Sequence, residues 1–251
     1  IRRQRQMFIR DRDWIGTDDL KIKILELREI TKWKVPIFIK IAGARPYYDT
    51  ALAVKAGADV VVLDGMQGGT AATQEVFIEN VGQPTLACIR PAVDALQDLN
   101  SHREVQLIIS GGIRNGADVA KALALGADAV SIGSAAMIAI GDNDPKWEKE
   151  YEKLGTKAGA YDDWHEGNDP AGISTQNPKL MKRLDPKKAG RKLSNYLKVM
   201  SLEAQTIARA CGKNSLHNLE PEDLCALTVE AAAMARVPLA GTNWIPGIDN
   251  K

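Results

Sequence analysis

Two glycine-rich turns carry the clearest chemistry in this chain. Ser110-Gly111-Gly112-Ile113-Arg114-Asn115-Gly116 follows one apolar run, and Gly133-Ser134 follows the next. Without a Cβ, paired glycines let backbone N–H groups come close to an anion. The spacing therefore predicts a phosphate site formed by Ser110, Gly111, Gly112, Gly133 and Ser134, with Arg114 as a source of positive charge. The alternative is that these glycines only form tight turns.

Three further strand ends carry residues that can bind a small molecule. Lys40 ends an apolar run, where an ammonium group is costly unless it meets a partner. Gly68-Gly69-Thr70 can present backbone donors and one hydroxyl to a flat ligand or a carboxylate. Arg90 can form a bidentate pair with a substrate carboxylate. The plain alternatives are a salt bridge at Lys40, a tight turn at Gly68-Gly69, and an ordinary ion pair at Arg90.

The elements that must position these residues alternate between strands and helices. Apolar runs predict strands at 36–41, 59–64, 84–90, 105–110 and 129–132, and helical spacing predicts helices between them, near 50–56, 74–80, 91–99 and 117–125. The stretch 53–61 repeats at 122–130, and each copy is a helix that ends at glycine before a β-branched strand. Alternating units of this length indicate an α/β fold with a parallel sheet.

The number of predicted strands indicates how much of a barrel fold this chain could form. In a (β/α)8 (TIM) barrel, a ligand's phosphate usually lies at the loops after strands seven and eight. Five strands are too few for that barrel, so we expect the C-terminal part, about strands four to eight, of a longer chain. We predict the barrel portion at 1–141, a charged helix and loop excursion at 142–190, and a C-terminal helical appendage at 191–251, with helices at 193–211 and 221–236.

Composition excludes several classes of function. The chain has 33 Lys and Arg against 32 Asp and Glu, so charge gives no case for nucleic acid. No apolar run approaches the roughly 20 residues of a membrane span. Three separated cysteines fit a reducing cytoplasm and offer no zinc site. The three histidines, at 102, 165 and 217, are scattered, and we expect them to be solvated rather than to bind a metal.

Several of these motifs resemble the FMN-binding domain of the glutamate synthase large-subunit family. The resemblance runs from about Asp13 to Gln176, and the loop Asp64-Gly65-Met66-Gln67-Gly68-Gly69-Thr70 is its most specific part. It implies an FMN-binding barrel in which the glycine turns hold the phosphate and Gly68, Gly69 and Thr70 lie at the cofactor. It also implies that Lys40 lies near the flavin and the 2-oxoglutarate site, which makes Lys40 a catalytic candidate. Arg90 is a second candidate, because its guanidinium could clamp a substrate carboxylate.

One segment departs from that family. Glutamate synthases carry a cysteine-rich stretch here that holds an iron–sulfur cluster and ends in a motif like Cys-Pro-Val-Gly-Val-Ala-Thr-Gln. This chain instead has Asp169-Pro170-Ala171-Gly172-Ile173-Ser174-Thr175-Gln176, and Trp164 and Asp169 stand where the resemblance leads us to expect cysteines. Carboxylate and indole do not replace thiolate on iron. We therefore expect no iron–sulfur cluster in this chain.

The long insert Asp142–Lys157 and the helical tail look closer to the glutamate-synthase-like subunit of N-methylglutamate synthases (methylamine–glutamate N-methyltransferases). That resemblance implies a redox-neutral exchange: flavin takes hydride from glutamate, methylamine displaces ammonia from the imine, and the hydride returns. Other subunits of such a complex are then expected partners. Two alternatives stay open, namely a glutamate synthase that aminates 2-oxoglutarate and a non-catalytic scaffold subunit of an amidotransferase-like assembly.

Overall fold

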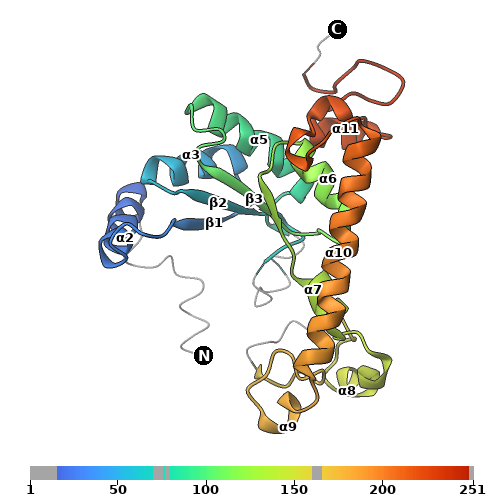
Figure 1. The fold of residues 1–251 in the computed structure, drawn as a ribbon. Helices are drawn as coiled ribbons and strands as arrows, with labels where there is room; N and C mark the ends of the chain where they lie inside the picture. The colour runs from blue at the N-terminus through green and yellow to red at the C-terminus, as the bar shows by residue number, and fades with distance from the viewer. Residues whose placement is uncertain (1–15, 70–75, 77–79, 160–165, 249–251) are drawn as a thin grey trace.

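A parallel sheet forms the centre of the molecule (Figure 1). The computed structural model describes residues 16–69, 76, 80–159 and 166–248. The four strands lie in sequence order: β1 (Phe38–Ala42), β2 (Val60–Asp64), β3 (Gln106–Ser110) and β4 (Ala129–Ser131). Each pair of neighbours is joined by a crossover helix: α3 (Pro46–Ala56), α5 (Thr85–Asp98) and α6 (Gly116–Ala124). The expected α/β architecture with a parallel sheet is confirmed.

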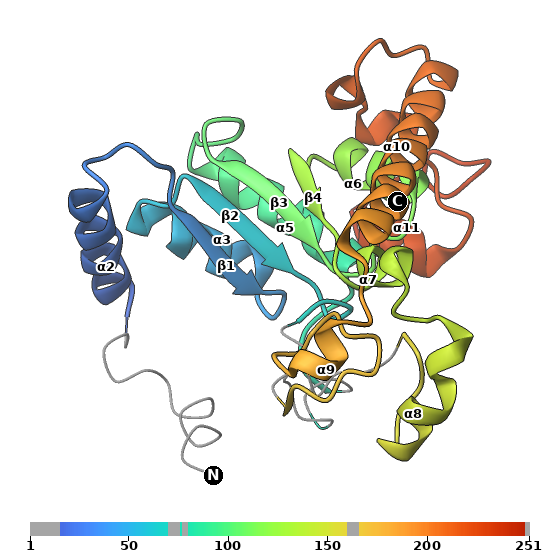
Figure 2. The same cartoon turned by 60° about the horizontal axis from the view of Figure 1, so that its bottom comes forward.

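The helices cover one face of this sheet (Figure 2). Alternate residues of a strand point to opposite faces, and Val61, Leu63, Leu107 and Ile109 are fully buried in the core beneath α3 and α5. On the other face Phe38 leaves 53% of its surface exposed. The helix α2 (Thr17–Ile30) lies beside α3 and packs Ile24 against Ala56.

The internal repeat extends to single hydrogen bonds. Gly57 and Gly126 both have a left-handed φ, of 103° and 108°, and follow the last turn of α3 and α6. Two residues after each glycine lies an aspartate whose side chain accepts a backbone hydrogen bond from the start of the neighbouring strand, or from the residue just before it. Asp59 Oδ2 accepts from the Ile37 N–H over 2.7 Å, and Asp128 Oδ2 accepts from the Leu107 N–H over 2.8 Å. The same Gly-Ala-Asp unit therefore starts β2 and β4.

The expected strand at 84–90 is wrong, because these residues form the first half of α5. The apolar residues that suggested a strand continue, at helical spacing, into the segment expected as a separate helix: Cys88, Ile89, Ala92, Val93 and Leu96 are all buried on one side. Pro91 lies inside this helix rather than at its start. The described sheet thus has four strands instead of five. The helix expected near 74–80 lies mostly outside the described residues.

The C-terminal part is helical, with long α10 as its main element. After α7 (Ser134–Ile140) come η1 (Pro145–Trp147), α8 (Glu148–Lys153), α9 (Pro178–Met181) and α10 (Pro186–Ala210). Last are η3 (Leu216–Asn218), η4 (Pro221–Asp223) and α11 (Val229–Ala235). The continuous helix expected over 221–236 is therefore wrong. Helix α10 packs on α6, where Ala204 and Ala208 meet Ala120 and Ala124. Over the described residues, every helix is too short or too polar to cross a membrane.

Candidate functional site

The two glycine turns face a common cleft of about 640 Å³ at the carboxyl ends of β3 and β4. A volume of this size falls within the roughly 300–1,000 Å³ of ligand and cofactor sites. Helix α7 and Tyr196 of α10 complete the wall. Eight residues singled out in the sequence line this cleft: Gly68, Gly69, Ser110, Gly111, Gly112, Arg114, Gly133 and Ser134. Thr70 lies outside the described residues.

The glycines of the cleft are there for different physical reasons. Gly111 has a φ of 104°, and a Cβ on it would lie 2.7 Å from the backbone nitrogen of Gly68. That glycine is explained by the close packing of two loops. Gly133 has a negative φ of −119°, and a Cβ on it would meet no protein atom within 4 Å. The protein itself leaves that space open.

Backbone donors remain available at the turns but not at the start of α6. At α6 the N–H groups of Arg114 and Gly116 donate to the carboxylates of Asp118 and Glu203, over 3.0 and 2.9 Å. Within the described chain, by contrast, the N–H groups of Gly111, Gly112 and Gly133 have no acceptor. An anion in the cleft would therefore be held by the turns and not by the end of α6.

The charge of Arg114 is already paired. Its Nε lies 3.0 Å from Asp118 Oδ2, its side chain is 75% exposed, and this hydrogen bond raises the pKa of the guanidinium. The Tyr196 hydroxyl donates to the carbonyl of Arg114 and so fixes α10 to the turn. Arg114 lines the cleft mainly through its position on the turn, and its charge faces Asp118.

Lys40 lies on the exposed face of the sheet and does not line the cleft. Its Nζ is 3.0 Å from Oδ2 of Asp64, a carboxylate at the end of β2 that is 8% exposed. The other oxygen, Oδ1, has no hydrogen-bond partner in the described part of the chain. It rests against Gly68, where a Cβ would lie 1.8 Å away. Asp64 thus connects Lys40 to the edge of the cleft.

The placement expected for Arg90 is wrong. Arg90 belongs to α5, on the helical side of the sheet, and is not at a strand end. Its Nη1 donates to the carbonyl of Leu125 over 3.2 Å at the end of α6. The cause is the mistaken strand at 84–90, since a helix in that place turns the side chain toward the neighbouring helix. Arg90 is not among the residues that line the glycine cleft.

The sequence patterns did not single out Gln67 as a site residue. It precedes Gly68 in the chain and lines the same cleft. Its Oε1 accepts from both the N–H and the hydroxyl of Thr85, over 2.8 Å each. These contacts join residues 18 positions apart. The sequence patterns do not predict this pairing, because they place Thr85 inside a strand and not at the start of a helix.

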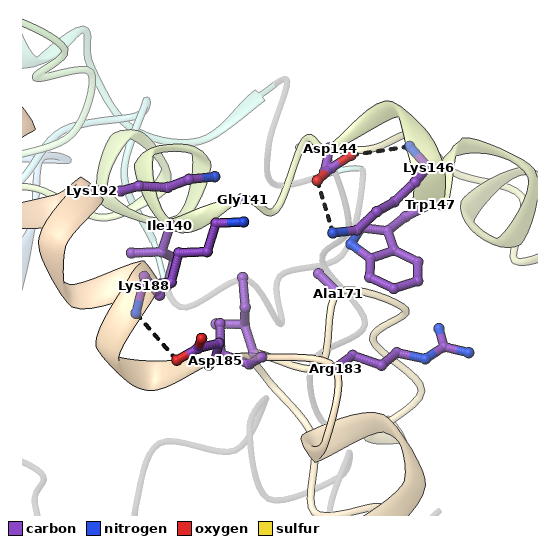
Figure 3. A pocket seen from close by; sticks show the side chains of 13 residues that line it. Ile140, Gly141, Asp144, Lys146, Trp147, Ala171, Arg183, Asp185, Lys188 and Lys192 are labelled. Carbon is purple, nitrogen blue, oxygen red and sulfur yellow. Dashed lines mark hydrogen bonds and ion pairs between the residues drawn. The ribbon is translucent and has the colours of Figure 1, made fainter.

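A second cleft, of about 230 Å³, lies at the far end of α7 (Figure 3). Lys146 pairs with Asp144 over 2.9 Å and lies over the Trp147 ring, and Arg183 also stacks on that ring. Lys188 and Lys192 extend toward Gly141 at the carboxyl end of α7, where helix carbonyls stabilise cations (Figure 3). Lys146 and Arg183 are thus paired with Asp144 and Glu150 of the protein itself, and we place the candidate site at the glycine turns.

The segment that departs from the expected cysteine motif is organised by Asp169. Its buried carboxylate accepts hydrogen bonds from the N–H groups of Ala171, Ile173 and Ser174, over 2.7–2.9 Å. It also accepts from the Tyr151 hydroxyl over 2.9 Å. In the described ranges no three His, Cys, Asp or Glu side chains are grouped to hold a metal. Asp169 therefore serves as the centre of a loop.

Comparison with known proteins identifies the family. Residues 9–145 and 160–214 match the family described as the conserved region in glutamate synthase. The chain belongs to the glutamate synthase family. A glutamate synthase large subunit-like protein of Rhizobium meliloti (strain 1021) is 83% identical over 235 residues, which cover 94% of this chain and 53% of that relative. An archaeal glutamate synthase [NADPH] of Methanocaldococcus jannaschii is 38% identical over 208 residues, covering 82% and 38% of the two chains.

The chain spans about half the length of the first of these relatives and about two fifths of the second. Among solved structures, a flavocytochrome b2 variant with sulfite bound has a TM-score of 0.48 and 20% identity. That match covers 78% of this chain and 37% of the flavocytochrome chain.

Proposed function

We propose that this chain forms the FMN-binding part of a glutamate-synthase-like enzyme that exchanges the amino group of glutamate for methylamine. The observation that carries the proposal is the cleft itself. It gathers eight of the residues on which the family resemblance rests, and it presents backbone N–H groups of Gly111, Gly112 and Gly133 that no described residue accepts. The open space at Gly133 fits a phosphate held against the backbone.

The proposed architecture is the C-terminal part of a (β/α)8 barrel. The four parallel strands lie in sequence order with their helices on one face, as in consecutive units of such a barrel. The glycine turns follow the last two strands, which fits strands seven and eight, so β1 and β2 become strands five and six. The exposed face with Phe38 and Lys40 would then line the interior once further strands close the barrel.

FMN bound in this cleft would supply hydride transfer to and from the α-carbon of the amino acid. The residues of the chain would bind and orient. The turns would hold the phosphate, and Lys40, fixed by Asp64, would place a positive charge near the ring or the substrate carboxylate. Closure of the site against water and alignment of the amine with the α-carbon would provide most of the rate.

The donor set around Asp169 favours methylamine exchange over net amination. Asp169 already accepts four hydrogen bonds and is a carboxylate, so the residues present do not fit an iron–sulfur cluster. Exchange of one amine for another consumes no external electrons and needs no cluster to deliver them. Glutamate and methylamine are then the substrates, and further subunits are the expected partners.

A second candidate, glutamate synthase itself, is favoured by the names of several relatives, which are 34–38% identical and called archaeal or archaeal-type glutamate synthase [NADPH]. That reaction would aminate 2-oxoglutarate and would require a reductant. A scaffold subunit without catalysis is the remaining alternative. The two enzymes would both bind flavin, whereas the scaffold would not.

The visible spectrum of the purified full-length protein, with any subunits that copurify, tests the proposal. We expect flavin absorption bands, release of FMN rather than FAD on denaturation, and no broad iron–sulfur absorption from this chain. A colourless protein that takes up no added FMN would overturn the proposal and leave the scaffold alternative.

A further inference from the structure

Gln67 holds the amino-terminal end of α5 with one side of its amide group. The backbone N–H and the hydroxyl of Thr85 both donate to Gln67 Oε1, each over 2.8 Å. Thr85 begins α5 directly after Pro84, which offers no side-chain cap. Because the first N–H groups of a helix need acceptors from outside it, Gln67 supplies one that the local sequence lacks.

These two hydrogen bonds fix the orientation of the amide. A backbone N–H can only donate, so the atom that faces Thr85 is the amide oxygen and the nitrogen lies on the other branch. The two branches of a planar amide diverge, so Nε2 lies on the branch that Thr85 does not engage. Within the described part of the chain, the hydrogen bonds of the Gln67 side chain are the two accepted by Oε1, so its N–H groups have no acceptor there.

The Gln67 side chain forms part of the wall of the glycine cleft. It runs alongside Gly112, where a Cβ would lie 3.4 Å from the Gln67 Cβ and 3.9 Å from its Cδ. A smaller cleft of about 260 Å³ between α5 and α6 also reaches Gln67, on the side of Thr85 and Leu86. Gln67 also lines the larger cleft, where Gly133 and Ser134 belong to the opposite turn.

We infer that Gln67 is a ligand-binding residue whose amide N–H group donates a hydrogen bond to an oxygen of the bound flavin nucleotide. This inference rests on the proposed function and names a donor that neither the glycine turns nor Lys40 supplies. The acceptor is either a phosphate oxygen or a carbonyl oxygen of the ring. In both cases a neutral side chain, oriented by Thr85, adds to the backbone donors of Gly111 and Gly112.

Gln67→Glu separates this role from the structural one. A glutamate at position 67 still accepts both hydrogen bonds from Thr85, and its charge suits the start of a helix. It replaces the N–H donor with a second acceptor that repels a ligand oxygen. In the full chain freed of flavin, we expect the melting temperature to be unchanged or higher. Affinity for FMN, measured by fluorescence quenching, should fall roughly tenfold or more, because one hydrogen bond is lost and the new carboxylate repels the ligand oxygen.

Two matched variants complete the experiment. Gln97→Glu makes the same charge change at the exposed end of α5 and should leave FMN affinity unchanged. Gln67→Met removes both amide functions, so it should lower the melting temperature as well as the affinity. Titration with riboflavin then locates the acceptor. If Gln67→Glu weakens FMN but not riboflavin, the acceptor is the phosphate, and if both weaken equally it is the ring.

The results that overturn the inference are distinct from those that overturn the proposed function. If the wild-type chain binds FMN and Gln67→Glu binds it as tightly, the inference is wrong and the proposed function stands. An equal loss of affinity in Gln97→Glu would also contradict it, since the effect would then be one of charge alone. A wild-type chain that binds no flavin would overturn the proposed function and this inference together.

Discussion

Gly133 and Gly111 line the same cleft, but glycine is needed at each position for a different physical reason. Gly111 is confined by Gly68 and Thr85, so any side chain there would push two loops apart. Gly133 meets no protein atom where its Cβ would lie, so the space it leaves open is available to a ligand. The distinction separates a glycine needed for folding from one needed for binding.

Gly133→Ala should therefore weaken FMN binding with little effect on the fold. A methyl group at this position would enter the cleft beside the free N–H groups, and we expect a loss of affinity of roughly tenfold. Unfolding by urea should show a cost of no more than about 1 kcal/mol, the usual penalty for alanine at a helix N-cap. Gly190→Ala, at an equally open position on α10, is the control. Unchanged affinity in Gly133→Ala would remove the main support for a phosphate at this turn.

Lys40→Met tests the cation on the sheet face. We expect stopped-flow reduction of bound flavin by glutamate to slow by roughly tenfold or more, because a preorganised cation stabilises negative charge that develops on the ring or the substrate. FMN should stay bound, since Lys40 does not line the cleft. Reduction at the wild-type rate would show that the pair with Asp64 is only structural.

At the scale of elements, the carboxylate of Asp59 anchors two neighbouring segments. Arg28 of α2 donates to Asp59 over 2.9 Å and to the Gly57 carbonyl over 2.8 Å, and Asp59 also accepts from the Ile37 N–H. The hydrogen bond from Arg28 and the one from Ile37 lower the pKa of Asp59. Helix α2 is thus tied to the start of β2 through one side chain.

Asp59→Asn should lower stability at neutral pH, because Asn binds Arg28 and Ile37 less strongly than a carboxylate. A depressed pKa in the folded state stabilises the fold above the unfolded pKa, and this contribution is lost as the pH falls through the folded pKa. We expect a difference of about 1–2 kcal/mol between wild type and variant at pH 7 that shrinks toward pH 3. Asp49→Asn, which breaks the exposed pair with Arg45 at the start of α3, is the control. A difference independent of pH would contradict the assignment.

In the buried network of Asp142, Tyr151 and Asp169, the pH dependence of stability runs in the opposite direction from that at Asp59. Burial raises the pKa of Asp142, and the Tyr151 hydroxyl lies 3.1 Å from one of its oxygens. A raised folded pKa gives stability that is fully present below the unfolded pKa and is lost as the pH rises through the folded value. Asp142→Asn, neutral at every pH, should therefore be at least as stable as wild type at pH 7 in thermal unfolding. Clear destabilisation by Asp142→Asn would show that the carboxylate is required as an anion.

Asp169→Ala should destabilise the same segment, because it leaves the N–H groups of Ala171, Ile173 and Ser174 without their acceptor. Each buried donor left unpaired costs about 1–3 kcal/mol. Limited proteolysis should then cut between α8 and α10 at least tenfold faster than in wild type, with the sheet region still protected. Equal protection in both proteins would show that the loop is held by other contacts.

Local sequence patterns predicted most elements of the fold, but they failed where a contact between residues far apart in the chain determines the structure. The glycine caps at 57 and 126, the strands after them and the turns at 111 and 133 follow from short motifs, and the structure has them. The segment 84–90 was expected as a strand because a short apolar run fits a strand or a buried helix equally well. Gln67, which supplies the acceptor at the start of α5, is 18 residues away, and the sequence gives no sign of that pairing. The wrong placement of Arg90 follows directly from the mistaken strand at 84–90.

At the scale of the whole molecule, the cleft depends on parts that are distant in the chain. The turns after β3 and β4 form its floor, while Tyr196 reaches it from α10 and donates to the carbonyl of Arg114. Glu203, on the same helix, accepts the N–H of Gly116 over 2.9 Å. Helix α10 therefore holds the start of α6 in place, and the site requires both the sheet and the helical part.

The central claim is that this chain serves a redox-neutral exchange on a flavin, and an anaerobic assay of the full-length protein with its copurifying subunits tests it most directly. The mixture contains glutamate and labelled methylamine, without NAD(P)H or ferredoxin. We predict equal amounts of labelled N-methylglutamate and released ammonia, and loss of both products in Gln67→Glu at limiting FMN. No labelled product from this mixture, with glutamate formed only when 2-oxoglutarate, ammonia and an external reductant are supplied instead, would contradict the account and identify the protein as a glutamate synthase.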